Sequence, residues 1–215
     1  MGVKIVQTSS RTKLHLFLLL IVIGFFIWSA IKPVRYSNWA LEVSPAVVGV
    51  IIAVIMYKKF RLTTLSYFII TILSVVVFIG GHYIYSNVPM FDWIKEQFDL
   101  GRNLYDRFGH FLKGLLAIVI REILLRKTPL TKGFWVNIIA ISMILAIAML
   151  YEISEWLFSY ISHGGRVSKD FLGTQGDIWD TQWDSTLTLV GSILSLLFFT
   201  KLHNRQLKKE VNTEP

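Results

Sequence analysis

The residues that could do chemistry are acids and a histidine set into long apolar stretches of the chain. Asp106 and His110 are four residues apart, so on a helix they share one face. Glu152 and Glu155 are three apart and share a face in the same way. Three aspartates spaced i, i+3 and i+7 form a stripe if a helix begins at the first of them. We predict one polar site with these catalytic candidates: Asp106, His110, Glu152, Glu155, Asp177, Asp180 and Asp184.

A divalent metal ion is one way to hold so many acids together. Charged groups inside a bilayer are costly and face one another or water. An excess of carboxylates therefore needs either protons or a counter-ion. Carboxylates with imidazole and without thiols suit Mg²⁺, Mn²⁺ or Zn²⁺, which can activate water or polarise a phosphoryl oxygen. The candidate metal ligands are Asp106, His110, Glu155, Asp180 and Asp184.

Short catalytic motifs do not name the reaction. The chain has no His-Glu-x-x-His, nucleophile elbow, phosphate-binding glycine loop or EF-hand pattern. It also has no cysteine, which excludes disulfides, thiolate metal sites and a cysteine nucleophile. We therefore assign no cofactor-binding residues, and the one cofactor that the sequence suggests is a divalent metal ion.

The elements that must position these residues are membrane helices. Of the 215 residues, 53% are hydrophobic and 17% are charged, against about 25% charged in an average soluble domain. A helix rises about 1.5 Å per residue and must cross about 30 Å of hydrocarbon. We predict an all-α, polytopic membrane helix bundle, forming a single integral membrane domain over residues 1–215. Its six spans are expected at about 14–31, 39–57, 62–85, 104–125, 133–161 and 184–200, followed by a basic cytoplasmic tail, 201–215.

The basic residues orient this bundle. With the N-terminus inside, thirteen Lys and Arg fall in inside segments and six in outside segments. This imbalance follows the positive-inside rule and predicts that both termini are cytoplasmic. The net charge of +8 then reflects the basic cytoplasmic segments of a membrane protein, and we expect no nucleic-acid partner. Arg121 and Glu122 fall at the cytoplasmic end, where we expect a snorkelling interfacial pair.

In this orientation the candidate residues gather at the outer end of the bundle, where Glu42 and His82 join them. Purely structural interpretations stand beside the catalytic one. Asp106 could pair with Arg107 at a helix start, and His110 could make an interhelical hydrogen bond. The three aspartates could form a solvated loop face, and Lys113 could be a structural partner for Glu152 or Glu155.

A set of motifs resembles the YjdF-like family of bacterial inner-membrane proteins. The resemblance covers about residues 39–207 and is carried by Val88-Pro89, Trp93, Leu100, Arg102-Asn103, Tyr105-Asp106-Arg107, Gly109-His110-Phe111, Gly114, Arg121-Glu122, Tyr151-Glu152, Glu155-Trp156 and the block from Phe171 to Asp184. It implies a multi-pass protein of the bacterial inner membrane and implies no particular reaction. The spacing of Asp106, His110 and the later acids is also distantly similar to VanZ-like membrane proteins.

Three functions fit these residues. The leading hypothesis is a metal-dependent enzyme at the outer leaflet that acts on a lipid or lipid-linked substrate, with membrane lipids as its partners. The first alternative is a transporter or channel for small cations or protons. The second is a non-catalytic membrane scaffold in which the polar cluster only holds helices together.

Overall fold

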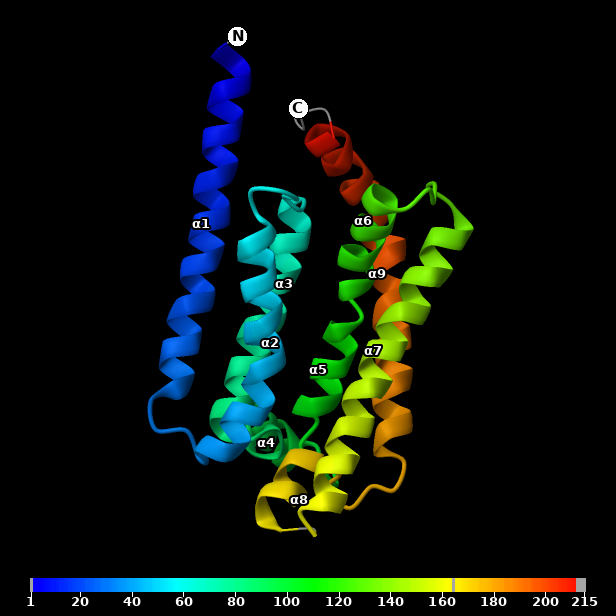
Figure 1. The fold of residues 1–215 in the computed structure, drawn as a ribbon. Helices are drawn as coiled ribbons and strands as arrows, with labels where there is room; N and C mark the ends of the chain where they lie inside the picture. Colours follow the sequence, from blue (N-terminus) through cyan, green and yellow to red (C-terminus); the bar gives the residue numbers. More distant parts are fainter. Residues whose placement is uncertain (1, 164, 212–215) are drawn as a thin grey trace.

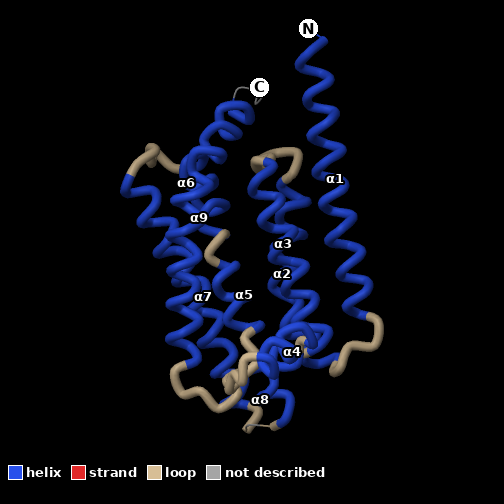
Figure 2. Tube along the Cα trace, turned by 180° about the vertical axis from the view of Figure 1, so that it is seen from behind, coloured by secondary structure: helices blue, strands red, loops and turns tan. Residues whose placement is uncertain are grey.

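The computed structural model describes residues 2–163 and 165–211, and every regular element in these residues is helical. The elements are α1 (Gly2–Ala30), α2 (Tyr36–Met56), α3 (Thr64–Tyr83), the 3₁₀ turn η1 (Tyr85–Asn87), α4 (Pro89–Gln97), α5 (Tyr105–Lys113), α6 (Leu116–Lys127), α7 (Phe134–Ile161), α8 (Arg166–Leu172) and α9 (Asp180–Val211). The long helices lie alongside one another (Figures 1 and 2). Both ends of the chain lie at one end of the bundle, which we call the termini end. The short helices α4 and α8 lie at the opposite end, which we call the α4–α8 end.

The predicted all-α membrane bundle is confirmed. In the described part of the chain, five helices are long and apolar enough to cross a membrane: Ser10–Ala30, Tyr36–Met56, Thr64–Tyr83, Phe134–Ile161 and Asp180–Glu210. The sixth crossing is made by α5 and α6, which follow each other along the bundle (Figure 1). An even number of crossings agrees with two termini at the same end.

The predicted span 104–125 is not one continuous helix. It is interrupted between Lys113 and Leu116, where the backbone tightens. There the N–H of Gly114 donates to the carbonyl of Phe111 (3.2 Å), and the N–H of Leu115 to that of Leu112 (2.9 Å). Hydrogen bonds between residues three apart, as in a 3₁₀ helix, replace the α-helical hydrogen bonds locally.

This interruption coincides with a close approach of α5 and α9. A Cβ on Gly191 would lie 2.0 Å from the carbonyl oxygen of Phe111, and a Cβ on Gly114 would lie 2.4 Å from the backbone nitrogen of Ser192. Only glycine therefore fits at either position. The Ser195 hydroxyl donates to the Gly114 carbonyl (3.3 Å). Close backbone contact through small and hydroxyl-bearing residues is typical of membrane helix pairs.

We predict that Gly191→Val destabilises the protein, because the new side chain meets the backbone of α5. Overpacking of this kind costs about 1–3 kcal/mol, sometimes more. The control is Gly24→Val on α1, where an added Cβ meets no atom within 4 Å. Thermal unfolding of the purified protein in detergent should show a lower midpoint for Gly191→Val only. Equal midpoints for both variants would contradict the contact.

The predicted basic tail is largely a continuation of the last span. Helix α9 runs without a break to Val211, and residues 212–215 lie outside the described residues. Within this extension His203 and Glu210 are buried against the bundle. Glu210 is paired with Arg11 of α1 at 2.7 Å. The segment from 201 to 211 is therefore part of the packed fold.

The expectation of a snorkelling Arg121–Glu122 pair is wrong, because both side chains are buried (1% and 0% exposed) and neither bonds the other in the described residues. Arg121 donates to the side chains of Asn137 (3.0 Å) and Asn204 (3.1 Å), and its NH1 lies 2.8 Å from Nδ1 of His203. It thus ties α6 to α7 and α9.

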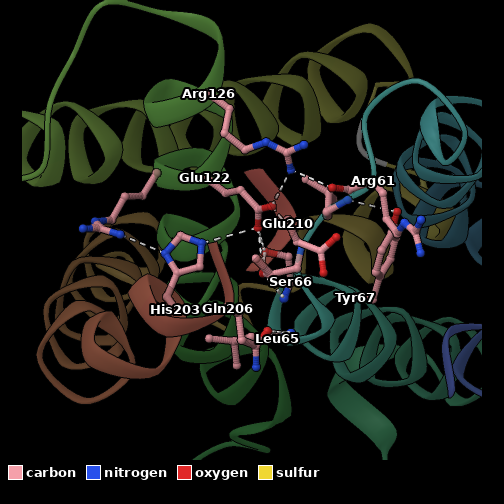
Figure 3. A network of polar contacts seen from close by, with 12 residues as sticks. Arg61, Leu65, Ser66, Tyr67, Glu122, Arg126, His203, Gln206 and Glu210 are labelled. Carbon is pink, nitrogen blue, oxygen red and sulfur yellow. Dashed lines mark hydrogen bonds and ion pairs between the residues drawn. The ribbon is translucent and has the colours of Figure 1, made fainter. Parts of the chain in front are cut away.

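Glu122 is the centre of a polar network at the termini end (Figure 3). Its carboxylate accepts hydrogen bonds from the N–H (2.8 Å) and hydroxyl (2.7 Å) of Thr63, and from the Ser66 hydroxyl (2.6 Å). Arg126 donates to it at 2.9 Å, and Nε2 of His203 lies 3.4 Å away. With several protein partners around it, this carboxylate fixes α3, α6 and α9 to one another.

We predict that Glu122→Ala lowers the free energy of unfolding by about 3 kcal/mol, because it leaves the buried N–H and hydroxyl groups of Thr63 and Ser66 without their acceptor. The control is Glu96→Ala on α4, an exposed position where the effect should stay within about 0.5 kcal/mol. Thermal or denaturant unfolding of both variants measures the difference. A loss for Glu122→Ala no larger than the control's would contradict the structural role.

Candidate functional site

Four of the predicted site residues come together near the α4–α8 end. Asp106 and His110 of α5 and Asp184 of α9 each offer one ligand atom, and these atoms all lie within 4.8 Å of one another. Oε1 of Glu152, from α7, lies 3.3 Å from Nε2 of His110, and Oδ1 of Asp106 lies 3.6 Å from the same nitrogen. We call these four residues the acidic cluster.

The close contact between α5 and α9 explains this convergence. The Thr188 hydroxyl of α9 donates to the backbone carbonyl of His110 (3.1 Å). This bond lies about one helical turn before the Gly114–Gly191 contact on both helices. Asp184 is one helical turn before Thr188, and Asp106 is one turn before His110. The two acids therefore meet one turn further from the glycine contact.

Several buried polar atoms of the acidic cluster make no hydrogen bond with the described residues. Nδ1 of His110, Oδ1 of Asp184 and Oε1 of Glu152 are all buried without a hydrogen bond. His110 is 2% exposed and Asp184 is 1% exposed. More than nine in ten buried polar groups in native proteins are hydrogen-bonded, so each exception calls for an explanation. Groups that could bind a ligand thus converge from three helices.

Lys113 brings a cation into the acidic cluster. Its Nζ lies 2.8 Å from Nε2 of His110 and 4.7 Å from the centre of the Tyr151 ring. The expected pairing of Lys113 with Glu152 or Glu155 is not found among the ion pairs of the described residues. One ammonium faces the three carboxyl groups of the cluster, so the cluster holds more acidic groups than cations.

Asp180 lies outside the group of three potential ligands. It forms a buried ion pair with Arg102, which also donates to the carbonyls of Gly173 and Thr174 at 3.3 Å each. Arg102 therefore neutralises Asp180 and fixes the loop before α9. The sequence offers one signal for this pair, because Arg102 is a basic residue shortly before Asp106 in the outer segment. The sequence analysis did not use this signal to pair Arg102 with Asp180.

Asp177 does not belong to a helical stripe, because α9 begins only at Asp180. Its carboxylate accepts the N–H of Trp179 (2.9 Å) and pairs with Arg107. The Trp179 N–H, and then the Arg107 guanidinium, hold the pKa of Asp177 below its ordinary value. The expected pairing of Arg107 with Asp106 is therefore replaced by pairing with Asp177.

A buried asparagine locks this loop to the segment before α5, a role that the sequence motif containing Asn103 did not predict. The N–H of Asn103 donates to the side chain of Gln175, whose amide donates back to the Asn103 carbonyl, both at 2.9 Å. The Asn103 side chain also donates to Asp92 of α4 (2.9 Å). These bonds fix the starts of α5 and α9 in register.

Glu155 lies on the wall of a cavity rather than in the group of three ligands. The cavity has a volume of about 370 Å³ and lies between α2 and α3 on one side and α5, α6 and α7 on the other. Its polar residues include Glu42, Asp106, Lys113 and Glu155. Asp106 thus belongs both to the acidic cluster and to the cavity, and it connects them.

We predict that Arg102→Ala destabilises the protein by about 3–5 kcal/mol, because it leaves the buried Asp180 charge unpaired. The control is Arg35→Ala, which breaks the more exposed Arg35–Asp170 pair and should cost at most about 1 kcal/mol. Unfolding midpoints of the two variants give the comparison. Similar losses for both would show that the Arg102–Asp180 pair does not support the loop.

Comparison with known proteins agrees with the resemblance noted in the sequence. A family model described as "Predicted membrane protein (DUF2238)" matches residues 14–205. The chain is 35% identical over 184 residues to the inner membrane protein YjdF of Escherichia coli (strain K12), covering 85% of this chain and 87% of that protein. No solved structure matches the chain.

Proposed function

The chain belongs to the DUF2238 family of predicted membrane proteins, and from this premise we propose that its acidic cluster is the site of a metal-dependent enzyme acting on a lipid or lipid-linked substrate. One observation carries the proposal. Asp106, His110 and Asp184 offer ligand atoms within 4.8 Å of one another, and buried atoms of His110 and Asp184 lack a protein partner among the described residues.

The donor set fits a hard or borderline divalent ion. Two carboxylates and one imidazole are ligands that Mg²⁺, Mn²⁺ and Zn²⁺ accept, and three protein ligands leave positions for water or substrate. When bound, such an ion supplies an activated water or a polarised phosphoryl oxygen. Asp106, His110 and Asp184 would hold it.

The remaining residues of the cluster would handle protons and charge. Glu152 lies 3.3 Å from Nε2 of His110, where a carboxylate orients the imidazole ring and can accept a proton. Lys113 contacts the same nitrogen. Its ammonium is placed to balance part of any negative charge beside the three residues that would hold an ion.

We place the acidic cluster at the outer leaflet of the bacterial inner membrane, with both termini in the cytoplasm. The Lys and Arg distribution favours this orientation, and the relative YjdF is an inner membrane protein. The cluster lies toward the end of the bundle opposite both termini (Figure 1). Lipid head groups at this depth are within reach of its carboxylates.

We predict that Mn²⁺ or Zn²⁺ raises the melting temperature of the purified protein and that Asp184→Asn reduces this stabilisation. Ligand binding stabilises the folded state in proportion to the logarithm of ligand concentration over Kd, and loss of a ligand should weaken binding at least about tenfold. The control is Asp99→Asn, an exposed acid outside the cluster. Absence of any ion-dependent shift in the wild type would sink the metal proposal.

Catalysis is tested separately, by lipid products. We expect the wild type, with divalent ion and a bacterial lipid extract, to convert one lipid class detectable by mass spectrometry. A folded Asp184→Asn variant should not convert it, whereas Asp99→Asn should. Ion flux in proteoliposomes without lipid turnover would instead support the transporter alternative. Neither activity, with unfolding in proportion to each cluster mutation, would support the scaffold.

A further inference from the structure

The cavity beside the acidic cluster has the size and walls of a site for a hydrocarbon chain. Its volume of about 370 Å³ falls in the range of small-molecule sites, about 300–1,000 Å³. Away from its polar end the walls are apolar and come from several helices, including Gly49 and Val50 of α2, Leu73 and Val77 of α3, and Ile147 and Ala148 of α7.

The cavity is accessible from the lipid side of the bundle. Gly49 and Ile147 line it and are nevertheless exposed, Ile147 to 51%. Helix α2 packs mainly on α3 and α8, whereas α7 packs mainly on α6, α9 and α8. The cavity therefore opens between two membrane-spanning helices. A hydrocarbon chain that enters by this route comes from the bilayer.

The polar end of the cavity is rich in carboxyl groups. The charged residues in its lining are Glu42, Asp106, Glu155, Asp170 and Lys113, and Asp170 is paired with Arg35. Glu42 and Glu155 are buried (6% and 8% exposed), and neither is in an ion pair with a described residue. Among the described residues, Lys113 is the one cationic side chain in this lining, so a ligand with a positive charge would complement Glu42 and Glu155 and stabilise their ionised form.

Aromatic rings at the same end strengthen this preference. Tyr85 and Tyr151 line the cavity, and the Tyr151 hydroxyl donates to Glu42 at 3.2 Å. The Lys113 ammonium lies over the Tyr151 ring at 4.7 Å. Cations bind over such ring faces, and quaternary and protonated amines are common occupants of aromatic sites next to carboxylates.

We propose that the cavity binds one acyl chain of a phospholipid whose head group carries an ammonium. The chain lies between α2 and α7, and the ammonium lies at Glu42 and Glu155. The phosphate faces Asp106 and the rest of the acidic cluster. This last placement rests on the proposed function, whereas the chain and ammonium sites rest on the cavity alone.

The acyl-chain site is tested by filling the cavity with a larger side chain. Wild-type protein, Gly49→Trp and Gly24→Trp are purified in detergent with equal amounts of phosphatidylethanolamine and phosphatidylglycerol of identical chains, and retained lipid is measured by native mass spectrometry. An added Cβ meets no atom at either glycine, so both variants should fold, and Gly24 lies outside the cavity. We expect Gly49→Trp to reduce retained lipid about tenfold, corresponding to about 1.4 kcal/mol, and Gly24→Trp to match the wild type.

Ala148→Phe fills the same cavity from α7 and provides a second variant if Gly49→Trp does not fold. Retention equal to that of the wild type in a folded cavity-filling variant overturns the chain site.

The ammonium site is tested by charge. Wild type should retain phosphatidylethanolamine at least about fivefold over phosphatidylglycerol, and Glu42→Gln with Glu155→Gln should abolish this preference while keeping total lipid. Equal retention of the two lipids by the wild type, or an unchanged preference in the double variant, overturns the head-group assignment. Divalent-ion content is measured on the same samples. Selective lipid without bound ion contradicts only the proposed function, and bound ion without selective lipid contradicts only this inference.

Discussion

The backbone contact between α5 and α9 is the constraint on which the rest of the structure depends. Gly114 and Gly191 allow the two helices to approach so closely that any other residue would collide with backbone atoms. The contact accompanies the interruption between α5 and α6, and it sets the distance between Asp106 and Asp184 about two helical turns away. A bundle of the same six spans with a wider separation here would carry the same acids without bringing them together.

Two buried polar clusters of the bundle differ in how far the protein satisfies them. Glu122 at the termini end is surrounded by donors from α3, α6 and α9. In the acidic cluster, buried atoms of His110, Glu152 and Asp184 make no hydrogen bond with the described residues. A carboxylate with several donors, such as that of Glu122, ties helices together, whereas converging side chains with unbonded buried atoms are costly and suit a ligand. This contrast is why we assign structure to one cluster and function to the other.

Composition and helical spacing were enough to predict the spans and part of the candidate site. Charge-poor runs revealed the membrane helices, and the four-residue spacing placed Asp106 with His110 on one face. Contacts between distant helices could not be predicted in this way. Asp177 and Arg107 are 70 residues apart, and the burial of Arg121 depends on α9 continuing past residue 200. Local periodicity encodes no such pairings, because they depend on which helices pack and how closely.

The most direct test of the metal site is a titration of purified protein with Mn²⁺ followed by electron paramagnetic resonance. We predict about one tightly bound ion per chain, lost in both Asp106→Asn and Asp184→Asn and kept in Asp180→Asn, because Asp180 is held by Arg102 instead. Bound Mn²⁺ that is insensitive to Asp106 and Asp184, or no bound Mn²⁺ in folded wild-type protein, would contradict the site.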